Sequence, residues 1–205
     1  MSSAERTEDR SALSGPERAR LLEIAGASID SGLERGHALE LEVGRESELL
    51  RRPGACFVTL RRDRELRGCI GSLEPSRPLA RDVAENAYRA AFHDPRFPPL
   101  GGSERAGLDV HLAILGPRSP IAAASEAELL SALRPGVDGL VVCEGPRRAT
   151  FLPAVWQSLS SPRDFVRELK RKAGLAADHW STDLRFERYE TESIPRVVGE
   201  PSASG

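Results

Sequence analysis

The chain has 205 residues, of which 40% are hydrophobic and 29% are charged, and its formal net charge is −2 at pH 7. This length and composition suit one large domain, or one domain with a small lobe. The slight acidic balance argues against a general binder of nucleic acid or of membrane surfaces, since such proteins usually carry a basic excess. Lys170 and Lys172 are the only lysines, so arginine is abundant and a single arginine is weak evidence for a special site.

The three cysteines, Cys56, Cys69 and Cys143, are far apart and odd in number. This usage argues against a disulfide scaffold and favours a reducing compartment. The first residues lack the apolar stretch of a signal peptide, and no apolar run approaches the ~18 residues of a membrane span. We therefore expect a cytoplasmic protein with no membrane partner.

The chain is predicted to begin with a tail and a capped helix. Residues 1–13 are polar and charged, which is typical of a disordered N-terminal tail. Ser14 and Glu17 then form a capping box, and apolar residues recur at helical spacing beyond it. Residues 37–53 show no periodicity and are expected to be a connection.

Helical and extended patterns then follow one another without regular alternation. Further helices are expected at residues 76–92, 125–133, 153–159 and 161–174. Strands are expected at residues 55–60, 65–72, 109–115, 139–143, 148–152 and 184–189. Two pairs of neighbouring strands have hairpin spacing, so we predict an α+β fold with a largely antiparallel sheet and packed helices. Residues 196–205 are expected to be a loose tail.

The segment Leu66-Arg67-Gly68-Cys69-Ile70-Gly71 is the most chemically suggestive part of the sequence. On a strand, Arg67 and Cys69 share a face with Gly71, while Leu66 and Ile70 point to the core. A guanidinium beside a thiol favours the thiolate. Gly68 and Gly71 leave room beside the sulfur for a ligand or for another backbone. Cys69 is therefore the candidate reactive or ligand-contacting thiol.

A structural interpretation of the same segment stays open. A free cysteine usually behaves as a small buried hydrophobe, and glycines in strands commonly mark bulges. The sequence does not decide between these two interpretations.

His93, Asp94 and Arg96 lie at the end of a predicted helix and in the Pro-rich turn that follows it. His93 could act as a base toward Cys69, with Asp94 orienting its ring. Alternatively, Asp94 braces the turn and His93 is a surface residue. Arg96 is expected to donate structural hydrogen bonds to nearby carbonyls, with anion binding as the alternative.

Asp138 lies in Pro135-Gly136-Val137-Asp138-Gly139. We expect it to support the turn that enters the second hairpin. Its neighbouring glycines would also leave it accessible to a ligand, so it is kept as a ligand-binding candidate.

Known cofactor and metal motifs are missing from the sequence. The four histidines show no HxxxH spacing and no two cysteines are close, so no metal site is predicted. The phosphate-binding and serine-hydrolase patterns GxGxxG, GxxxxGK[ST] and GxSxG do not occur in the contexts they require. We predict no cofactor.

Residues 66–71 are similar to the signature hexapeptide of the AMMECR-one domain, whose bacterial and archaeal members are called AmmeMemoRadiSam system protein A. The resemblance spans roughly residues 18–192. Its further blocks are Pro78-Leu79, Asp82, Asn86-Ala87, Ala91-Phe92, residues 94–100, residues 133–140, residues 148–153, Val155-Trp156, residues 172–175 and Trp180. One departure is visible, because the family's first hairpin often turns on Asp-Gly and this chain has Asp63-Arg64.

The resemblance implies a single AMMECR-one domain over residues 14–195, with a larger and a smaller lobe. It implies no established activity. The system name implies two partners, a Memo-type protein and a radical S-adenosylmethionine enzyme.

Three functions are compatible with the sequence. The first is an enzyme, or an enzyme component in a small redox pathway, that uses Cys69 with Arg67. The second is a non-catalytic adaptor that binds a partner enzyme or its peptide substrate. The third is a nucleic-acid-associated regulator, which the acidic balance makes the least favoured.

Overall fold

The computed structural model of the chain describes residues 13–196, which divide into two compact units. The first unit contains residues 13–112 and 194–196, and the second contains residues 113–193. Within the described residues, no helix is both long and apolar enough to cross a bilayer.

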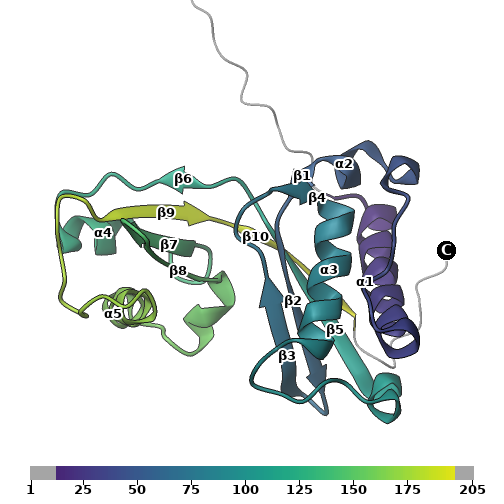
Figure 1. Cartoon of the computed structure of the whole chain (residues 1–205). Helices are drawn as coiled ribbons and strands as arrows, with labels where there is room; N and C mark the ends of the chain where they lie inside the picture. The colour runs from purple at the N-terminus through teal and green to yellow at the C-terminus, as the bar shows by residue number, and fades with distance from the viewer. Residues whose placement is uncertain (1–12, 197–205) are drawn as a thin grey trace, which may run out of the picture. The chain divides into compact units, whose positions relative to one another are not determined.

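Helices and strands are numbered in chain order and labelled in Figure 1, and the short 3-10 turns are written η. The helical elements are α1 (Gly15–Arg35), η1 (Val43–Arg45), α2 (Glu48–Arg51), α3 (Leu79–Phe92), η2 (Gly102–Gly107), α4 (Glu126–Ala132), η3 (Pro153–Gln157) and α5 (Pro162–Lys172). The strands are β1 (Pro53–Gly54), β2 (Cys56–Arg62), β3 (Glu65–Gly71), β4 (Arg77–Pro78), β5 (Leu108–Leu115), β6 (Ser119–Pro120), β7 (Gly139–Glu144), β8 (Arg147–Phe151), β9 (Arg185–Tyr189) and β10 (Thr191–Arg196).

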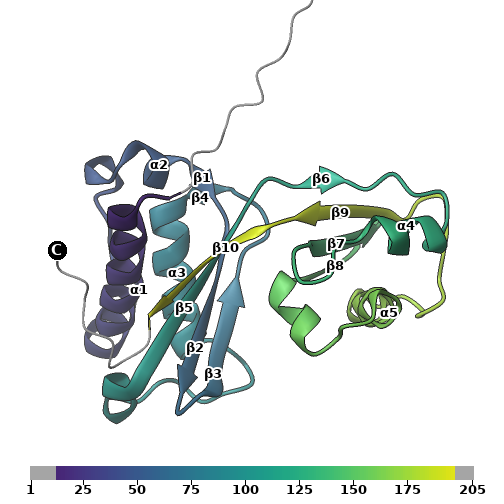
Figure 2. The same cartoon turned by 180° about the vertical axis from the view of Figure 1, so that it is seen from behind.

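The first unit is built in three layers. A four-stranded sheet has the order β10-β5-β2-β3, so β3 is an edge strand. Helix α3 packs on β2 and β3, and α1 packs on the other side of α3 (Figures 1 and 2). The predicted capping box opens α1, because Ser14 accepts the Glu17 N–H while the Glu17 carboxylate accepts the Ser14 N–H.

A buried carboxylate joins α3 to the first hairpin. Asp82, which is fully buried, accepts hydrogen bonds from the Cys56 N–H at 2.9 Å and from the Ser72 hydroxyl at 2.5 Å. Asn86 and Arg77 also donate to it, at 3.0 and 2.9 Å. A buried charge is tolerated when hydrogen bonds of this kind replace its hydration, so Asp82 fixes the start of β2 against the first turn of α3.

Strands β2 and β3 form an antiparallel hairpin with a shift in register. Leu60 lies opposite Gly68, whereas Arg61 lies opposite Leu66, so Arg67 is an extra residue on β3. This is a β-bulge, which bends the strand and turns side chains out of simple alternation. The predicted burial of Leu66 is therefore wrong: its side chain is 37% exposed.

The second unit packs two helices on a sheet of order β6-β9-β7-β8. Strand β7 pairs antiparallel with both β8 and β9. The core contains Leu140, Val142 and Phe186, with Trp156 stacked on Phe165 at 3.8 Å between ring centroids. These contacts confirm the α+β class and the antiparallel pairing expected from the two hairpins.

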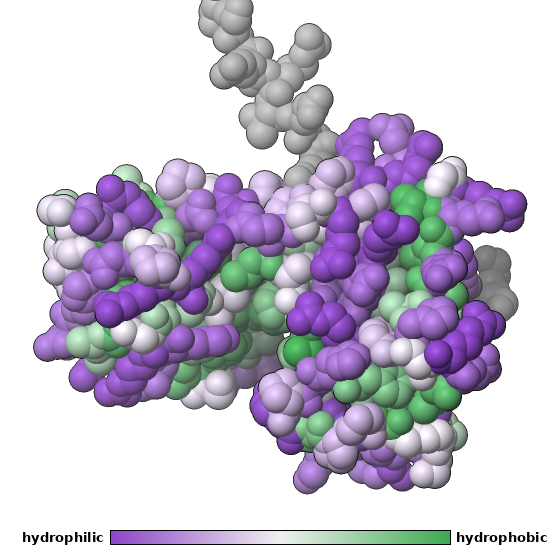
Figure 3. Space-filling model, in the orientation of Figure 1, coloured by the Kyte–Doolittle hydropathy of each residue, from purple (hydrophilic) through white to green (hydrophobic). Residues whose placement is uncertain are grey.

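Several boundaries differ from the predictions. The helix expected at residues 76–92 begins at Leu79, because Arg77–Pro78 pairs as a short strand with Pro53–Gly54. The connection 37–53 contains η1 and α2, which are too short to show periodicity. Hydrophilic side chains predominate on the surface in this part of the view in Figure 3.

The predicted tails, residues 1–13 and 196–205, lie mainly outside the described residues. The two tail residues that are described, 13 and 196, belong to the folded part of the chain instead. Leu13 is buried, and Arg196 is the last residue of β10. Strand β10 was not predicted at all. Its sequence contains Pro195, and proline is unfavourable inside a sheet because it has no N–H to donate. Strand β10 tolerates this proline because it lies at the edge of its sheet.

The turn of the first hairpin supplies a prediction. Asp63 and Arg64 both have positive φ, 51° and 69°, which is the geometry of a type I′ turn without its usual glycine. We expect Arg64→Gly to raise the free energy of unfolding by up to about 1 kcal/mol, because glycine relieves the left-handed strain. Urea denaturation measures it.

The control for this turn is Arg62→Gly, which lies in extended backbone one residue before it. There the same loss of a side chain should lower stability, because glycine weakens a strand. Equal destabilisation by both changes would contradict the role given to the positive φ of Arg64.

Candidate functional site

Cys69 lies on the sheet face that α3 does not cover. Cys56, Val58 and Leu60 of β2 are fully buried toward the helix, and they alternate with half-buried Thr59 on the other face. Cys69 is directly opposite Thr59 in the register. Its sulfur is 3.2 Å from the Thr59 hydroxyl, and the residue is half-buried. The sulfur therefore has a polar neighbour and belongs to a residue that is not fully buried.

Asp94 and Arg96 close the edge of β3 at Cys69. At the Thr59–Cys69 pair, the main-chain N–H and C=O of Cys69 point away from β2. Because β3 is an edge strand, no further strand lies on that side to bind them. Asp94 Oδ2 accepts this N–H at 2.8 Å, and Arg96 Nη2 donates to the carbonyl at 3.4 Å. Both main-chain groups of Cys69 are thus held by one side-chain pair.

The same two side chains hold each other. Arg96 Nε donates to Asp94 Oδ1 at 2.9 Å, and Arg96 Nη2 donates to Oδ2 at 2.6 Å. The hydrogen bonds from Arg96 oppose the desolvation of this buried carboxylate, and the Cys69 N–H adds to them, so the pKa of Asp94 lies well below its usual range. Asp94 therefore braces the turn, which is the alternative role predicted for it, and it also braces the strand.

The Arg67 side chain pairs with Glu104 and not, as predicted from the sequence, with the Cys69 thiol. Its guanidinium donates to Glu104, from Nε at 2.7 Å and from Nη2 at 3.1 Å, and it lies 5.8 Å from the centre of the Phe97 ring. The hydrogen bonds from Arg67 lower the pKa of Glu104 to about 2. Because Arg67 is the bulged residue, it is turned toward η2, and its charge is neutralised there.

His93 is exposed at the end of α3, and its ring packs edge-on against Tyr88 at 5.1 Å. Among residues 13–196 it makes no hydrogen bond with Cys69. The predicted pairing of the two side chains has no contact to support it.

Gly68 and Gly71 make room for the protein rather than for a ligand. A Cβ at Gly68 would lie 2.1 Å from the Ala90 carbonyl oxygen of α3, and one at Gly71 would lie 2.3 Å from the Phe57 ring. The space predicted beside the sulfur is therefore filled by the chain's own packing.

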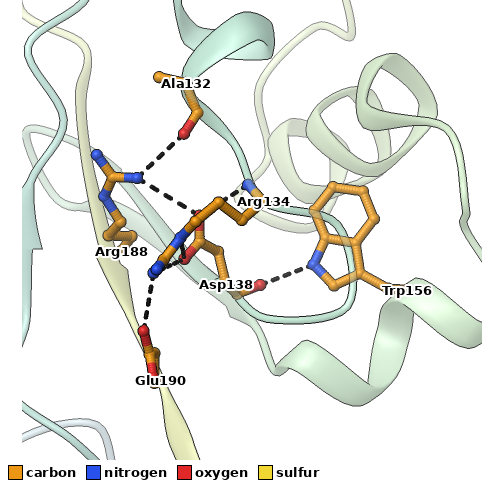
Figure 4. A network of polar contacts seen from close by, with 6 residues as sticks. All are labelled: Ala132, Arg134, Asp138, Trp156, Arg188 and Glu190. Carbon is orange, nitrogen blue, oxygen red and sulfur yellow. Dashed lines mark hydrogen bonds and ion pairs between the residues drawn. The ribbon is translucent and has the colours of Figure 1, made fainter.

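Asp138 belongs to the second unit, and its carboxylate is fully buried (Figure 4). It accepts hydrogen bonds from the N–H of Arg134 at 2.9 Å and from its guanidinium, while Arg188 approaches to 3.6 Å. Trp156 donates its indole N–H to the Asp138 carbonyl at 2.7 Å. The expected turn-supporting role is confirmed, and the expected accessibility is wrong because arginines occupy the carboxylate.

The other thiols have different surroundings. Cys56 is fully buried, and burial raises its pKa well above the usual value, with the Asp82 charge adding to the effect. Cys143 is half-buried, as Cys69 is, and therefore offers a comparison within the same chain. Within the described part of the chain, no group of three or more His, Cys, Asp and Glu side chains is placed to hold a metal ion.

Two contacts of the site were not predicted. Thr59 would face Gly68 in a regular hairpin, and only the bulge brings it opposite Cys69. Glu104 lies 37 residues from Arg67, so the sequence gives no local indication of their ion pair. Its position three residues after Gly101 indicates a helix cap instead, and its carboxylate accepts the Gly101 N–H at 2.8 Å.

These features define an α+β protein in which a half-buried cysteine lies on a braced edge strand. The chain belongs to the AMMECR1 family, whose model matches residues 22–194. This confirms the resemblance stated from the sequence.

Relatives and a solved structure agree with this family. A protein of Methanothermobacter thermautotrophicus is 36% identical over 186 residues, covering 88% of this chain and 94% of that protein. A protein of Thermotoga maritima is 35% identical over 166 residues, covering 80% and 90%. The crystal structure of uncharacterized protein PH0010 from Pyrococcus horikoshii matches with a TM-score of 0.77 and 31% identity, covering 84% of this chain and 88% of that one. None of these three names states an activity.

The Asp94 contacts predict a pH-dependent loss of stability in Asp94→Asn. We expect the variant to lose about 1–3 kcal/mol at pH 7, because the Cys69 N–H and Arg96 lose their charged acceptor. The pKa of Asp94 is lower in the folded chain than the ~3.9 of an unfolded chain, so its contribution is complete above about pH 5 and falls as the pH drops below 4. Denaturation of both proteins from pH 8 to pH 2.5 measures this difference.

The control is Asp178→Asn, which removes an exposed carboxylate. It should change stability by less than about 0.5 kcal/mol at every pH. A wild-type advantage over Asp94→Asn that persists unchanged at pH 2.5 would contradict the assignment.

Close packing at Gly68 supplies another prediction. Gly68→Ala should lower the free energy of unfolding by about 1–3 kcal/mol, since its methyl group overlaps the Ala90 carbonyl. Gly44→Ala is the matched control, because nothing lies within 4 Å of its Cβ position. Equal thermal midpoints for the two variants would contradict the packing argument.

Proposed function

We propose that this protein is an enzyme, or a component of one, that uses the Cys69 thiol to contact and act on a small ligand. The observation that carries the proposal is the support given to this one residue. Its main-chain N–H and C=O are both held by the Asp94–Arg96 pair, while the residue is only half-buried and its sulfur lies beside a hydroxyl. A packing cysteine would need neither feature.

Such support is what a reacting group requires. Reacting atoms must be held within fractions of an ångström, which calls for a rigid element and a surrounding shell of hydrogen bonds. A strand edge is normally the least constrained part of a sheet, and here it is fixed at the residue that carries the thiol. The Thr59 hydroxyl lies 3.2 Å from the sulfur, within hydrogen-bond distance of the proposed reacting atom.

The wider setting of the proposal comes from the family resemblance alone. It is a small redox pathway in which the protein works with a Memo-type protein and a radical S-adenosylmethionine enzyme.

One observation favours the alternative, a non-catalytic adaptor for a partner enzyme or its peptide substrate. The guanidinium expected to activate the thiol is bound to Glu104 instead. If Cys69 were only a contact residue, Cys69→Ser would keep partner binding intact.

The test of the catalytic proposal is the rate of alkylation by iodoacetamide at pH 7, followed by peptide mass spectrometry. In this reaction the sulfur bonds to the reagent's carbon and iodide leaves. We expect Cys69 to react about five- to tenfold faster than Cys143, which is also half-buried, and Cys56 to stay unlabelled in the folded chain.

Thr59→Val, which keeps the shape and removes the hydroxyl, should bring the rate at Cys69 down toward that at Cys143. A wild-type Cys69 that reacts no faster than Cys143 refutes the proposed function. Binding assays of Cys69→Ser with the two proposed partners then decide whether the adaptor alternative takes its place.

A further inference from the structure

Two arginines flank one aromatic ring beside Cys69. The guanidinium carbons of Arg67 and Arg96 lie 5.8 and 5.5 Å from the centre of the Phe97 ring. Arg67 is two residues from Cys69 along β3, and Arg96 donates to the Cys69 carbonyl. Phe97 of the Pro-rich turn therefore contacts two guanidinium groups, of which that of Arg96 reaches the main chain of Cys69.

Each arginine keeps one guanidinium nitrogen unused. Arg67 Nη1 is sealed from solvent and has no hydrogen-bond partner among the described residues. Arg96 donates through Nε and Nη2 only, and its side chain is 53% exposed. An arginine offers five N–H donors in a planar fork, so Arg96 retains donors that a ligand can reach.

The acidic partners of these arginines are engaged in hydrogen bonds within the protein. Asp94 accepts the N–H groups of Cys69 and Arg96 and the Arg96 guanidinium. Glu104 accepts from Arg67 and from the Gly101 N–H. Bonds from the arginines lower the pKa of both carboxyl groups, so both stay charged at neutral pH.

The charges of this cluster balance. Arg62 lies 3.8 Å from Glu104 and 3.9 Å from Asp63, so three guanidinium groups face three carboxylates. What favours an anion is therefore the half-exposed guanidinium of Arg96 and not a local excess of positive charge. The hydrogen bonds to Asp94 raise the pKa of Arg96, so this guanidinium stays charged.

From this geometry we infer that Arg96 forms a subsite for the carboxylate of a small anionic ligand whose reacting end meets the Cys69 sulfur. Guanidinium and carboxylate match in shape and charge, and a half-exposed site keeps the ligand exchangeable. Asp94 holds the Arg96 fork in place, and Phe97 supports its face. The inference rests on the proposed function in taking Cys69 as the reacting group.

The test compares two alkylating reagents that differ only in charge, iodoacetate and iodoacetamide. Both form the same sulfur–carbon bond and release iodide. We expect the ratio of the iodoacetate rate to the iodoacetamide rate to be about three- to fivefold higher at Cys69 than at Cys143, the size of one half-exposed ion pair. In the wild-type protein, 0.5 M sodium chloride should reduce this excess, because salt screens exposed charges.

Variants locate the effect. Arg96→Gln should remove the excess at Cys69 and Arg96→Lys should keep part of it, with folding checked by thermal denaturation. Arg81→Gln removes an equally positive but separate side chain of α3 and should leave the ratio unchanged. An equal ratio at Cys69 and Cys143, or an excess that survives both Arg96→Gln and high salt, overturns the inference.

The two proposals fail in different ways. Fast alkylation of Cys69 by both reagents without any preference for iodoacetate supports the proposed function and refutes the anion subsite. A clear preference for iodoacetate at a Cys69 that reacts slowly with iodoacetamide supports the subsite and refutes the proposed function.

Discussion

The hydrogen bond from the Cys69 N–H to the Asp94 carboxylate is the contact on which the arrangement around the thiol depends. An edge strand leaves main-chain groups unpaired, and a buried carboxylate without donors is costly. Here one hydrogen bond of 2.8 Å gives the Cys69 N–H an acceptor and gives the Asp94 carboxylate a donor. Arg96 completes the exchange, because it neutralises Asp94 and also reaches the Cys69 carbonyl. The Pro-rich turn is therefore fixed to β3 by the residue that carries the sulfur.

Local order in this fold was predictable where a short stretch of sequence determines it. Ser14, Ser125 and Ser161 cap the helices that their spacing predicts, and Gly36 and Gly174 end helices in the left-handed region. These signals act within one turn of helix. The two hairpins were also recognisable, since apolar strands flank turns that are only two residues long in the structure.

The site was harder to predict because a single inserted residue changes its register. A regular hairpin would place Thr59 opposite Gly68, yet the bulge at Arg67 moves Cys69 into that position. The same insertion turns Arg67 toward Glu104 and leaves Leu66 exposed. Side-chain alternation identifies a shared face only while the pairing stays regular, and nothing in residues 65–71 except their glycines marks the interruption.

Two aspartates in loops that contain proline show which contacts lie beyond local reasoning. Asp138 accepts the N–H and the guanidinium of Arg134, four residues away, so its bonds brace its own turn and could be expected from sequence. Asp94 pairs with Arg96 in a similar local way, but its remaining bond goes to Cys69, 25 residues earlier.

The two loops differ in what their non-local contacts reach. Both aspartates are buried and both are charge-paired, so neither burial nor pairing marks one of them as part of a site. The loop of Asp138 is joined to Arg188 and Trp156 within the second unit, whereas the loop of Asp94 is joined to the edge strand that bears the half-buried Cys69. Under the proposed function, the Asp94 carboxylate stabilises the fold and positions the reacting thiol through the same hydrogen bonds, so one substitution is expected to affect both.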